Sequence, residues 1–309
     1  MFSVIFPGQG SQAVGMGKEF YENYPVVKEI FSKANEVLKY DLTKIILEGP
    51  VSEINLTENT QPAIFLVSYS IFSVMEKEFN INLNKANYFA GHSLGEYSAL
   101  ACANSLGFED AILLLSKRGK SMQSAVPVGK GSMLAVLGKD IRYIEDILNQ
   151  NNDFKDCQIA NDNCPGQVVI SGSSNGIKNL TELLKKKSIK SIILPVSAPF
   201  HCFMMNKSTE IMTKYINETK FETPNPKIVS NVTADEKNNN EEIKKLLIKQ
   251  IESKVRWRES IEYIIKKGSK EFIEIGPGKV LSGLIKRINN GVKIFNINSI
   301  KDIIDYKNQ

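Results

Sequence analysis

The residues best suited to covalent chemistry lie in Gly91-His-Ser-Leu-Gly95, which has the pattern Gly-x-Ser-x-Gly. The motif follows an expected short strand at 87–91 and opens an expected helix at 96–103, which is the setting that a nucleophile elbow requires. The two glycines permit a tight turn, so the Ser93 hydroxyl would project into a cleft that backbone N–H groups and the positive end of the helix also face. The alternative is a plain strand–turn–helix connection with Ser93 as the helix cap. The flanking elements favour the nucleophile.

A serine nucleophile needs a base, and the chain contains only two histidines, His92 and His201. His92 is adjacent to Ser93 on a sharp turn, where its side chain is expected to point elsewhere. His201 remains, and it could remove the hydroxyl proton during attack and later return it to the leaving group. The alternative is a histidine with a structural role only.

Three further features argue against an ordinary esterase. The glycine-rich Pro7-Gly-Gln-Gly-Ser-Gln12 fits neither a dinucleotide-binding nor a phosphate-binding loop, but it could offer a backbone N–H to an oxyanion. Arg118, in the helix expected near 109–123, could bind a carboxylate through its planar guanidinium, although an arginine there is more often a surface residue. No aspartate stands out between Ser93 and His201 as the third member of a hydrolase triad.

Length and composition bound the class of protein. The 309 residues can bury a large domain and a smaller one, and 42% hydrophobic and 24% charged residues are ordinary for a globular protein. The start of the chain has no secretory signal pattern, and no run approaches the roughly 20 apolar residues of a membrane helix. Four cysteines without metal-ligand spacing predict buried free thiols in a reducing cytosol, and therefore a cytoplasmic protein.

The net charge of +5 comes from lysines that are scattered among asparagine and glutamate residues. Nucleic-acid binding would need basic residues that are concentrated and interleaved with aromatic ones, so it is not expected. The one short basic run, Lys185–Lys187 followed by Lys190, is typical of a solvated helix end. A mildly positive surface would still attract an acidic partner.

The expected elements fall into two sets. One set alternates helices with short strands, which predicts a mainly parallel sheet covered by helices. Its helices are expected near 18–39, 61–79, 96–103 and 109–123, and its strands near 2–6, 87–91, 227–230, 272–275 and 292–297. A polar surface loop is expected at 235–240.

The other set has the order β-α-β-β-α-β, which is the ferredoxin-like arrangement. Its strands are expected at 132–137, 157–160, 167–171 and 189–194, and its helices at 140–149 and 174–187. We therefore predict an inserted ferredoxin-like α+β domain at 127–197, and an α/β core formed by 1–126 and 198–309.

Several motifs together make the sequence resemble the malonyl-CoA:acyl carrier protein transacylases of bacteria and organelles nearly end to end. The motifs are Phe6-Pro-Gly-Gln-Gly-Ser-Gln12, Gln61-Pro-Ala, Gly91-His-Ser-Leu-Gly-Glu-Tyr97, Arg118-Gly, Asn163-Cys-Pro-Gly-Gln-Val168, Pro195-Val-Ser to His201, Ser230-Asn-Val-Thr-Ala and Glu274-Ile-Gly-Pro-Gly278. Each motif is moderately specific alone, and the set in this order is highly specific.

This resemblance implies a hydrolase-like α/β core and an S-malonyltransferase of fatty acid biosynthesis that works by ping-pong exchange. Ser93 would carry the malonyl group, and His201 would be the base. The backbone N–H groups of Gln9 and Leu94 would form the oxyanion hole, and the main-chain carbonyl of Gln250 would orient His201.

The resemblance also implies a substrate site in which Arg118 binds the malonyl carboxylate. Residues that would line or support this site are Gln61, His92, Asn163, Gln167 and Phe200. Asn163 and Gln167 would face the pantetheine arm, and Phe200 matches the pattern of malonyl-selective relatives. The implied substrates are malonyl-CoA and a phosphopantetheinylated, acidic acyl carrier protein that binds transiently, with no metal or redox cofactor, and we expect a monomer.

Three other functions remain open from the sequence. A serine thioesterase or esterase would use the same residues and release free acid. A non-catalytic module for carrier binding would not need Ser93, His201 and Arg118 intact. A transferase for longer acyl chains would have no use for an arginine in the pocket.

Overall fold

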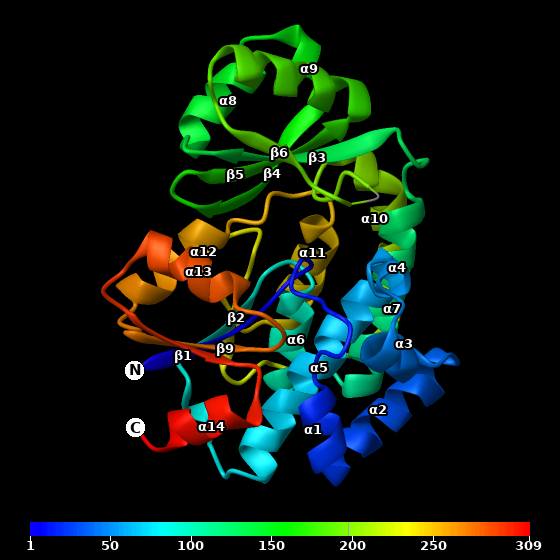
Figure 1. Cartoon of the computed structure of the whole chain (residues 1–309), viewed down its shortest axis with the longest axis vertical. Helices are drawn as coiled ribbons and strands as arrows, with labels where there is room; N and C mark the ends of the chain where they lie inside the picture. Colours follow the sequence, from blue (N-terminus) through cyan, green and yellow to red (C-terminus); the bar gives the residue numbers. More distant parts are fainter. Residues whose placement is uncertain (197) are drawn as a thin grey trace.

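The computed structural model describes residues 1–196 and 198–309, which form a main unit with a small unit above it (Figure 1). The main unit is built on a six-stranded sheet in the order β10-β9-β1-β2-β7-β8, in which every pair is parallel except β7 with β8. Its strands are β1 (Phe2–Phe6), β2 (Tyr88–Gly91), β7 (Lys227–Val229), β8 (Glu236–Lys237), β9 (Glu271–Ile275) and β10 (Lys293–Ile297). The expected mainly parallel α/β sheet is confirmed.

Helices bury both faces of this sheet, which explains why the central strands β1 and β2 are almost wholly apolar. Alternate residues of β1 serve the two faces: Val4 and Phe6 belong to one hydrophobic cluster, and Ile5 belongs to another. The helices of the main unit are α1 (Lys18–Asn23), α2 (Pro25–Leu38), α3 (Leu42–Glu48), α4 (Val51–Ile54), α5 (Thr57–Lys77), α6 (Gly95–Cys102), α7 (Phe108–Ser124), α10 (Asn206–Glu218), α11 (Asn240–Gln250), α12 (Trp257–Lys266), α13 (Val280–Ile288) and α14 (Ile300–Lys307). Short 3₁₀ turns lie at Leu83–Lys85 and Phe203–Met205.

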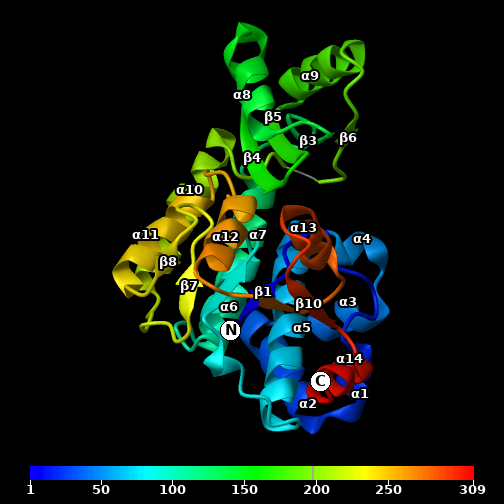
Figure 2. The same ribbon diagram turned by 90° about the vertical axis from the view of Figure 1, so that its left-hand side faces the viewer.

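The small unit, residues Gly131–Ile193, carries a four-stranded antiparallel sheet in the order β4-β5-β3-β6. Its elements are β3 (Gly131–Leu137), α8 (Ile141–Asn149), a 3₁₀ turn (Asn152–Phe154), β4 (Cys157–Cys164), β5 (Gln167–Ser173), α9 (Ser174–Lys186) and β6 (Ser191–Ile193). Helices α8 and α9 lie on the side of this sheet away from the main unit (Figure 2). The opposite face packs on the main unit through Met133, Ala135 and Val169.

Three sequence expectations need correction. The helix expected at 18–39 is two helices, because Pro25 restricts the preceding residue and Tyr24 is extended at φ −123° and ψ 118°. The loop expected at 235–240 contains β8, which pairs with β7. Strand β4 does not end at Ala160 but runs on to Cys164, with two register shifts against β5. The polar residues of β4 between Ala160 and Cys164 contribute to the candidate site.

The four cysteines are free and buried, as expected. No helix in the described part of the chain is long and apolar enough to cross a membrane. The small domain expected at 127–197 ends at position 197, which lies outside the described residues.

Candidate active site

The serine motif forms a strained turn between β2 and α6. Ser93 has φ 54°, a left-handed conformation that residues with side chains seldom adopt. A Cβ on Gly91 would lie 1.9 Å from the carbonyl oxygen of Gly95, and one on Gly95 would lie 2.3 Å from the carbonyl oxygen of Phe6. The two glycines therefore allow the turn to pack against β1, and this packing holds the serine in its unusual conformation.

The Ser93 hydroxyl meets His201, which follows the small unit in the chain. Ser93 Oγ lies 2.8 Å from His201 Nε2, and His201 Nδ1 lies 2.9 Å from the carbonyl oxygen of Gln250. A carbonyl can only accept, so Nδ1 carries the proton and Nε2 is free to accept the serine proton. Burial and the nearby charge of Arg118 lower the pKa of His201 to about 3, so its imidazole is neutral. The pair has the geometry of a serine with its general base.

Arg118 is a buried residue and not a surface one: it is 1% exposed. Its guanidinium donates to Gln61 Oε1 at 2.7 Å and to Gln250 Oε1 at 2.9 Å, and it also reaches Ser93 Oγ at 3.2 Å. Burial lowers the pKa of this group from its ordinary value. A guanidinium nevertheless stays protonated in proteins, so Arg118 carries a positive charge. Within residues 1–196 and 198–309, the groups that accept from Arg118 are uncharged, so an anionic ligand would bring it a directly bonded negative charge.

Two residues that the sequence interpretation left without a role support the turn. Asn231 Oδ1 accepts from the Ser93 N–H at 2.7 Å, and Asn231 Nδ2 donates to the Gly91 carbonyl at 2.7 Å. Glu96 Oε2 accepts from the Asn231 N–H at 3.0 Å and from Gln250 Nε2 at 2.8 Å. Burial raises the pKa of Glu96 to about 7. Both residues lie inside motifs of the family resemblance, which is the signal that could have found them.

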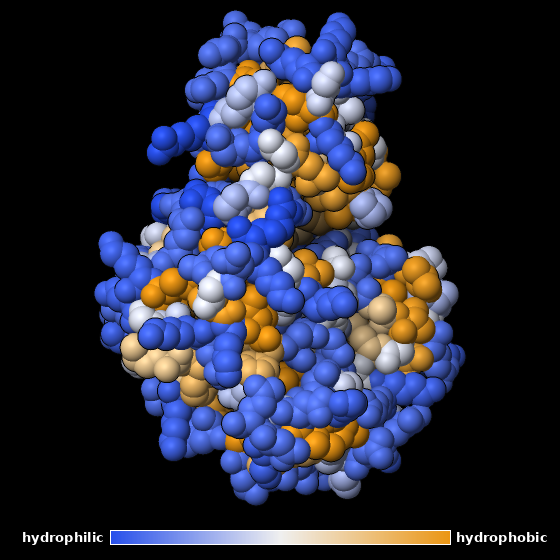
Figure 3. Space-filling model, turned by 60° about the vertical axis from the view of Figure 1, so that its left-hand side comes forward, coloured by the Kyte–Doolittle hydropathy of each residue, from blue (hydrophilic) through white to orange (hydrophobic). Residues whose placement is uncertain are grey.

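The Ser93–His201 pair opens into a cleft of about 300 Å³ between the two units, and the hollow is visible in Figure 3. The predicted residues that line it are Gln9, Gln61, His92, Leu94, Arg118, Asn163 and Phe200. His92 Nε2 lies 2.9 Å from Asn163 Oδ1, so a residue of the elbow contacts β4 directly across the cleft. Burial lowers the pKa of His92. The small unit adds Met133, Asn161 and Val169, which had not been predicted.

Gln167 lies apart from this lining. Its Oε1 accepts from Arg287 at 3.0 Å, in an exposed contact between the β4–β5 turn and α13. The structure therefore brings all but one of the predicted substrate residues to the cleft, and it places Gln167 at a surface nearby.

Two backbone N–H groups near the serine are free to donate. In residues 1–196 and 198–309, the N–H groups of Gln9 and Leu94 donate to no other group of the chain, and both residues line the cleft. The loop that carries Gln9 packs tightly on the elbow, because a Cβ on Gly8 would lie 2.6 Å from the His92 carbonyl oxygen. Among the described residues, no group of three or more histidine, cysteine, aspartate or glutamate side chains is arranged to hold a metal ion.

Comparison with known proteins shows the family to which the chain belongs. Residues 3–297 match the acyl transferase domain family. The malonyl CoA-acyl carrier protein transacylase of Bacillus subtilis is 43% identical over 291 residues, which is 94% of this chain and 90% of the relative. The acyl-carrier-protein-S-malonyltransferase of Bartonella henselae has a TM-score of 0.96 and 39% identity, over 99% of this chain and 98% of that one.

A second similar structure is a malonyl-transacylase in complex with its holo type II PKS acyl-carrier protein. It has a TM-score of 0.95 and 36% identity and covers 99% of both chains. The family match thus makes the chain an acyltransferase, and the partly buried Ser93–His201 pair is compatible with that class. Within that class, the chain belongs to the malonyl CoA-acyl carrier protein transacylase family.

Proposed function

We propose that the chain transfers a malonyl group from malonyl-CoA to the phosphopantetheine thiol of an acyl carrier protein, through an ester on Ser93. One observation carries the proposal: the Ser93 hydroxyl lies between a neutral imidazole at 2.8 Å and a buried guanidinium at 3.2 Å. The first contact suits acyl chemistry, and the second suits an acyl group that ends in a carboxylate.

In the first half-reaction, His201 Nε2 takes the proton of Ser93 as the oxygen attacks the thioester carbonyl carbon. The N–H groups of Gln9 and Leu94 stabilise the oxyanion, and each well-placed donor contributes roughly 100- to 1000-fold in rate. The carbon–sulfur bond then breaks, and the imidazolium returns its proton to the coenzyme A thiolate. The contact of the Gln250 carbonyl with Nδ1 fixes the tautomer that this step requires.

In the second half-reaction, the carrier thiol enters the cleft and gives its proton to His201. The thiolate attacks the Ser93 ester, and the same N–H groups stabilise the oxyanion. Collapse returns the serine oxygen with its proton and leaves a malonyl thioester on the carrier. The first half-reaction sends one proton out on the coenzyme A thiol, and the second takes one in from the carrier thiol, so protons balance over the full exchange. No step changes an oxidation state, and the proposed exchange uses neither a metal nor a redox cofactor.

Arg118 selects the acyl group. A malonyl carboxylate would accept two hydrogen bonds from its planar guanidinium and would replace the present contacts with Gln61 and Gln250. Hydrogen bonds to a charged group contribute on the order of 1.5–3 kcal/mol each. Two of them would favour malonyl over acetyl by a factor of about 100 or more.

The remaining predicted residues shape the path of the substrate. Gln61 and Phe200 line the acyl pocket, and His92 supports the pocket by its contact with Asn163. Asn163 faces the pantetheine arm inside the cleft. Gln167 would meet the carrier or its arm from outside, through the surface that it shares with Arg287.

The mainly parallel main sheet with a serine turn between β2 and α6 supports a hydrolase-like core, and the strand order of the small unit supports a ferredoxin-like insert. In the small unit, the chain order β3-α8-β4-β5-α9-β6 with the sheet order β4-β5-β3-β6 favours the ferredoxin-like description. We propose a core of 1–126 and 198–309 with an insert at 127–197, in a protein that acts as a cytoplasmic monomer on an acidic carrier.

Intact mass spectrometry tests the proposed function. The protein is mixed separately with malonyl-CoA, acetyl-CoA and methylmalonyl-CoA, and holo carrier is then added. We expect a stable malonyl adduct that disappears as malonyl carrier forms. Fast release of free malonate before the carrier is added would support a thioesterase, and an unmodified protein that only binds carrier would support a non-catalytic module.

A further inference from the structure

Strand β4 presents alternate residues to two different sites. Asn161 and Asn163 line the cleft, whereas Asp162, which lies between them, lines a separate hollow with Arg258 and Glu262. Successive side chains of a strand point to opposite faces, so the position of Asp162 governs how its two neighbours face the cleft. This stretch is also the part of β4 with irregular pairing to β5, so the regular ladder alone does not fix it.

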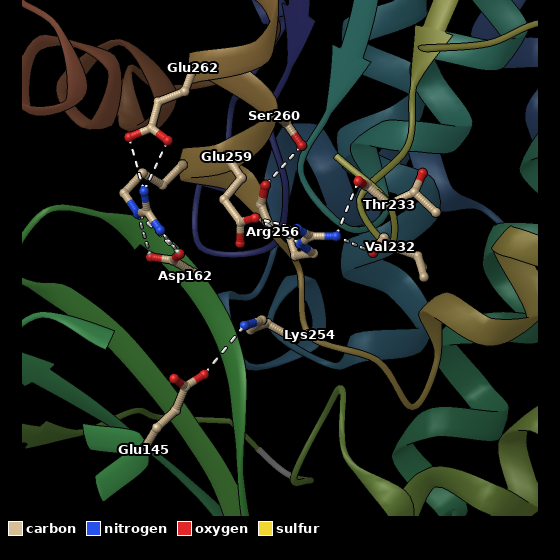
Figure 4. A network of polar contacts seen from close by, with 10 residues as sticks. Glu145, Asp162, Val232, Thr233, Lys254, Arg256, Glu259, Ser260 and Glu262 are labelled. Atoms are coloured by element: carbon tan, nitrogen blue, oxygen red, sulfur yellow. Dashed lines mark hydrogen bonds and ion pairs between the residues drawn. The ribbon is translucent and has the colours of Figure 1, made fainter. Parts of the chain in front are cut away.

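Asp162 is held by an arginine of the main unit. Its side chain is 2% exposed and accepts from Arg258 Nε at 3.2 and 3.1 Å and from Arg258 Nη2 at 2.8 Å. Arg258, on α12, also donates to both oxygens of Glu262 at 3.0 and 2.9 Å. Figure 4 shows Asp162 on the strand and Glu262 on the helix, with these ion pairs drawn between them. The inner carboxylate is buried and the outer one is 49% exposed.

Backbone contacts join the same strand to the main unit. The Val255 N–H donates to the Ala160 carbonyl at 2.8 Å, and the Asp162 N–H donates to the Val255 carbonyl at 3.0 Å. Val255 lies five positions after Gln250, whose carbonyl contacts His201. The next residue, Arg256, donates its N–H to the carbonyl of Asn231 at 3.0 Å. One segment of the main unit therefore supports both the wall of the cleft and the residues behind Ser93.

We infer that Asp162 and Arg258 are positioning residues. Their ion pair, which we call the clasp, holds β4 against the main unit and sets where Asn161 and Asn163 lie in the substrate cleft. This inference rests on the proposed function. The clasp acts on the wall of the cleft, whereas Ser93, His201 and Arg118 are held by contacts within the main unit. Its loss therefore weakens binding of malonyl-CoA and leaves the rate of the chemical step nearly unchanged.

The variant that best tests the clasp is Asp162→Ala. It removes both carboxylate oxygens through which β4 accepts from Arg258. It leaves no buried charge unpaired, because Arg258 keeps its ion pair with Glu262. Replacing Arg258 instead would leave the buried carboxylate of Asp162 without its positive partner, which could prevent folding. Asp162→Asn keeps the volume and one acceptor oxygen, so it provides a milder second variant. Glu262→Ala is the matched control, because it removes the other carboxylate from the same arginine without touching β4.

The experiment is single-turnover acylation, followed by intact mass at a series of malonyl-CoA concentrations. For Asp162→Ala we expect the half-saturating concentration to rise about 10-fold, as for the loss of a hydrogen bond to a charged group. The limiting acylation rate should stay within about 2-fold. Asp162→Asn should give a smaller rise, and Glu262→Ala should stay within about 2-fold on both counts.

Three results would overturn the clasp. They are an unchanged half-saturating concentration in Asp162→Ala, an equal effect in Glu262→Ala, and a lowered melting temperature without any change in binding. The first two remove the positioning role, and the third reduces the pair to a stabilising contact. Failure of the proposed function is separate, because it would appear as the absence of a malonyl adduct on the unmodified protein.

Discussion

The main unit and the small unit contribute different chemistry to one cleft. The main unit provides the hydroxyl, the imidazole and the guanidinium of Ser93, His201 and Arg118, each fixed by buried or partly buried hydrogen bonds. The small unit provides neutral amides and apolar side chains on β3, β4 and β5. The main unit therefore carries the reaction and the selection of a charged acyl group, while the small unit shapes the space that the substrate enters. Changes in the main unit should therefore alter rates and acyl preference, and changes in the small unit should alter affinity.

The sharpest test of this division is Ser93→Ala. Without the hydroxyl no ester can form, so we expect the malonyl adduct to vanish and transfer to fall by at least about 10⁴-fold. Ser98→Ala is the control, because Ser98 lies on α6, directly after the serine turn, and its buried hydroxyl has no partner among the described residues. A malonyl adduct that survives on Ser93→Ala, seen by intact mass, would place the nucleophile elsewhere.

Arg118→Ala tests the charge selection of the main unit. Removal of two hydrogen bonds to the carboxylate should lower kcat/KM for malonyl-CoA about 100-fold more than that for acetyl-CoA. The neighbouring Lys117→Ala, at a partly exposed position, should leave the ratio unchanged. Equal losses for the two substrates would show that Arg118 supports the fold of the site and does not select the acyl group.

The pH profile tests whether burial in the main unit sets the state of His201. Its pKa is lowered to about 3, so the neutral base persists as pH falls below 6.5, where an exposed histidine would become protonated. We expect kcat/KM for acetyl-CoA, which has no carboxylate to titrate, to stay within about 2-fold from pH 7.5 to 5. An ordinary histidine of pKa about 6.5 would lose about 30-fold over that range.

The lowered pKa of His201 also makes the folding stability of the protein depend on pH. The unfolded chain takes up a proton at His201 below pH 6.5 and the folded chain does not, so this residue's contribution is present above pH 6.5 and is lost as pH falls toward 3. Circular dichroism at each pH serves as the control for folding. Glu96, with a pKa of about 7, titrates in the same range, so the contradicting result is an acid limb centred between pH 6 and 7 that persists in a folded Glu96→Gln variant.

Asn163→Ser tests the contribution of the small unit. It removes the oxygen that His92 Nε2 contacts at 2.9 Å and opens the wall of the cleft. We expect KM for malonyl-CoA to rise about 5-fold with kcat little changed, as for the loss of one neutral hydrogen bond. Asn175→Ser, at an exposed position of α9, is the control. A fall in kcat with KM unchanged would mean that the small unit takes part in the chemical step.

The smallest expected effect comes from the basic end of the small unit. Lys186→Glu with Lys190→Glu should raise KM for the carrier about 3-fold at low salt, and the effect should fade at high salt because the charges are exposed. Lys28→Glu with Lys85→Glu makes the same charge change at exposed positions of the main unit. If both pairs behave alike, the run at Lys186 is ordinary solvated surface.

Local sequence predicted much of the fold and part of the site. The alternating elements indicated a parallel sheet, and the Gly91–Gly95 motif indicated Ser93 because the glycine requirement of the turn is local. His201 could be chosen because the chain has only two histidines. Family resemblance added Gln250, whose role rests on its main-chain carbonyl and leaves no trace in residue type.

The remaining features could not be predicted because they depend on contacts far apart in the chain. Its own helix favoured a surface position for Arg118, and only the family resemblance put it in the substrate site, since the helix alone does not show that Gln61 and Gln250 would enclose it. The short strand β8 was missed because two polar residues have no strand pattern of their own.

The sequence by itself determined which side chains could react and the order of the elements, because short-range periodicity and turn chemistry act within a few residues. Tertiary structure alone decided which of those side chains are buried, charged and close to one another. It packed Glu96 and Asn231 behind the serine and joined Asp162 to Arg258. These pairs are 135 and 96 residues apart in the chain, and only the folding of the whole molecule brings them within hydrogen-bonding distance.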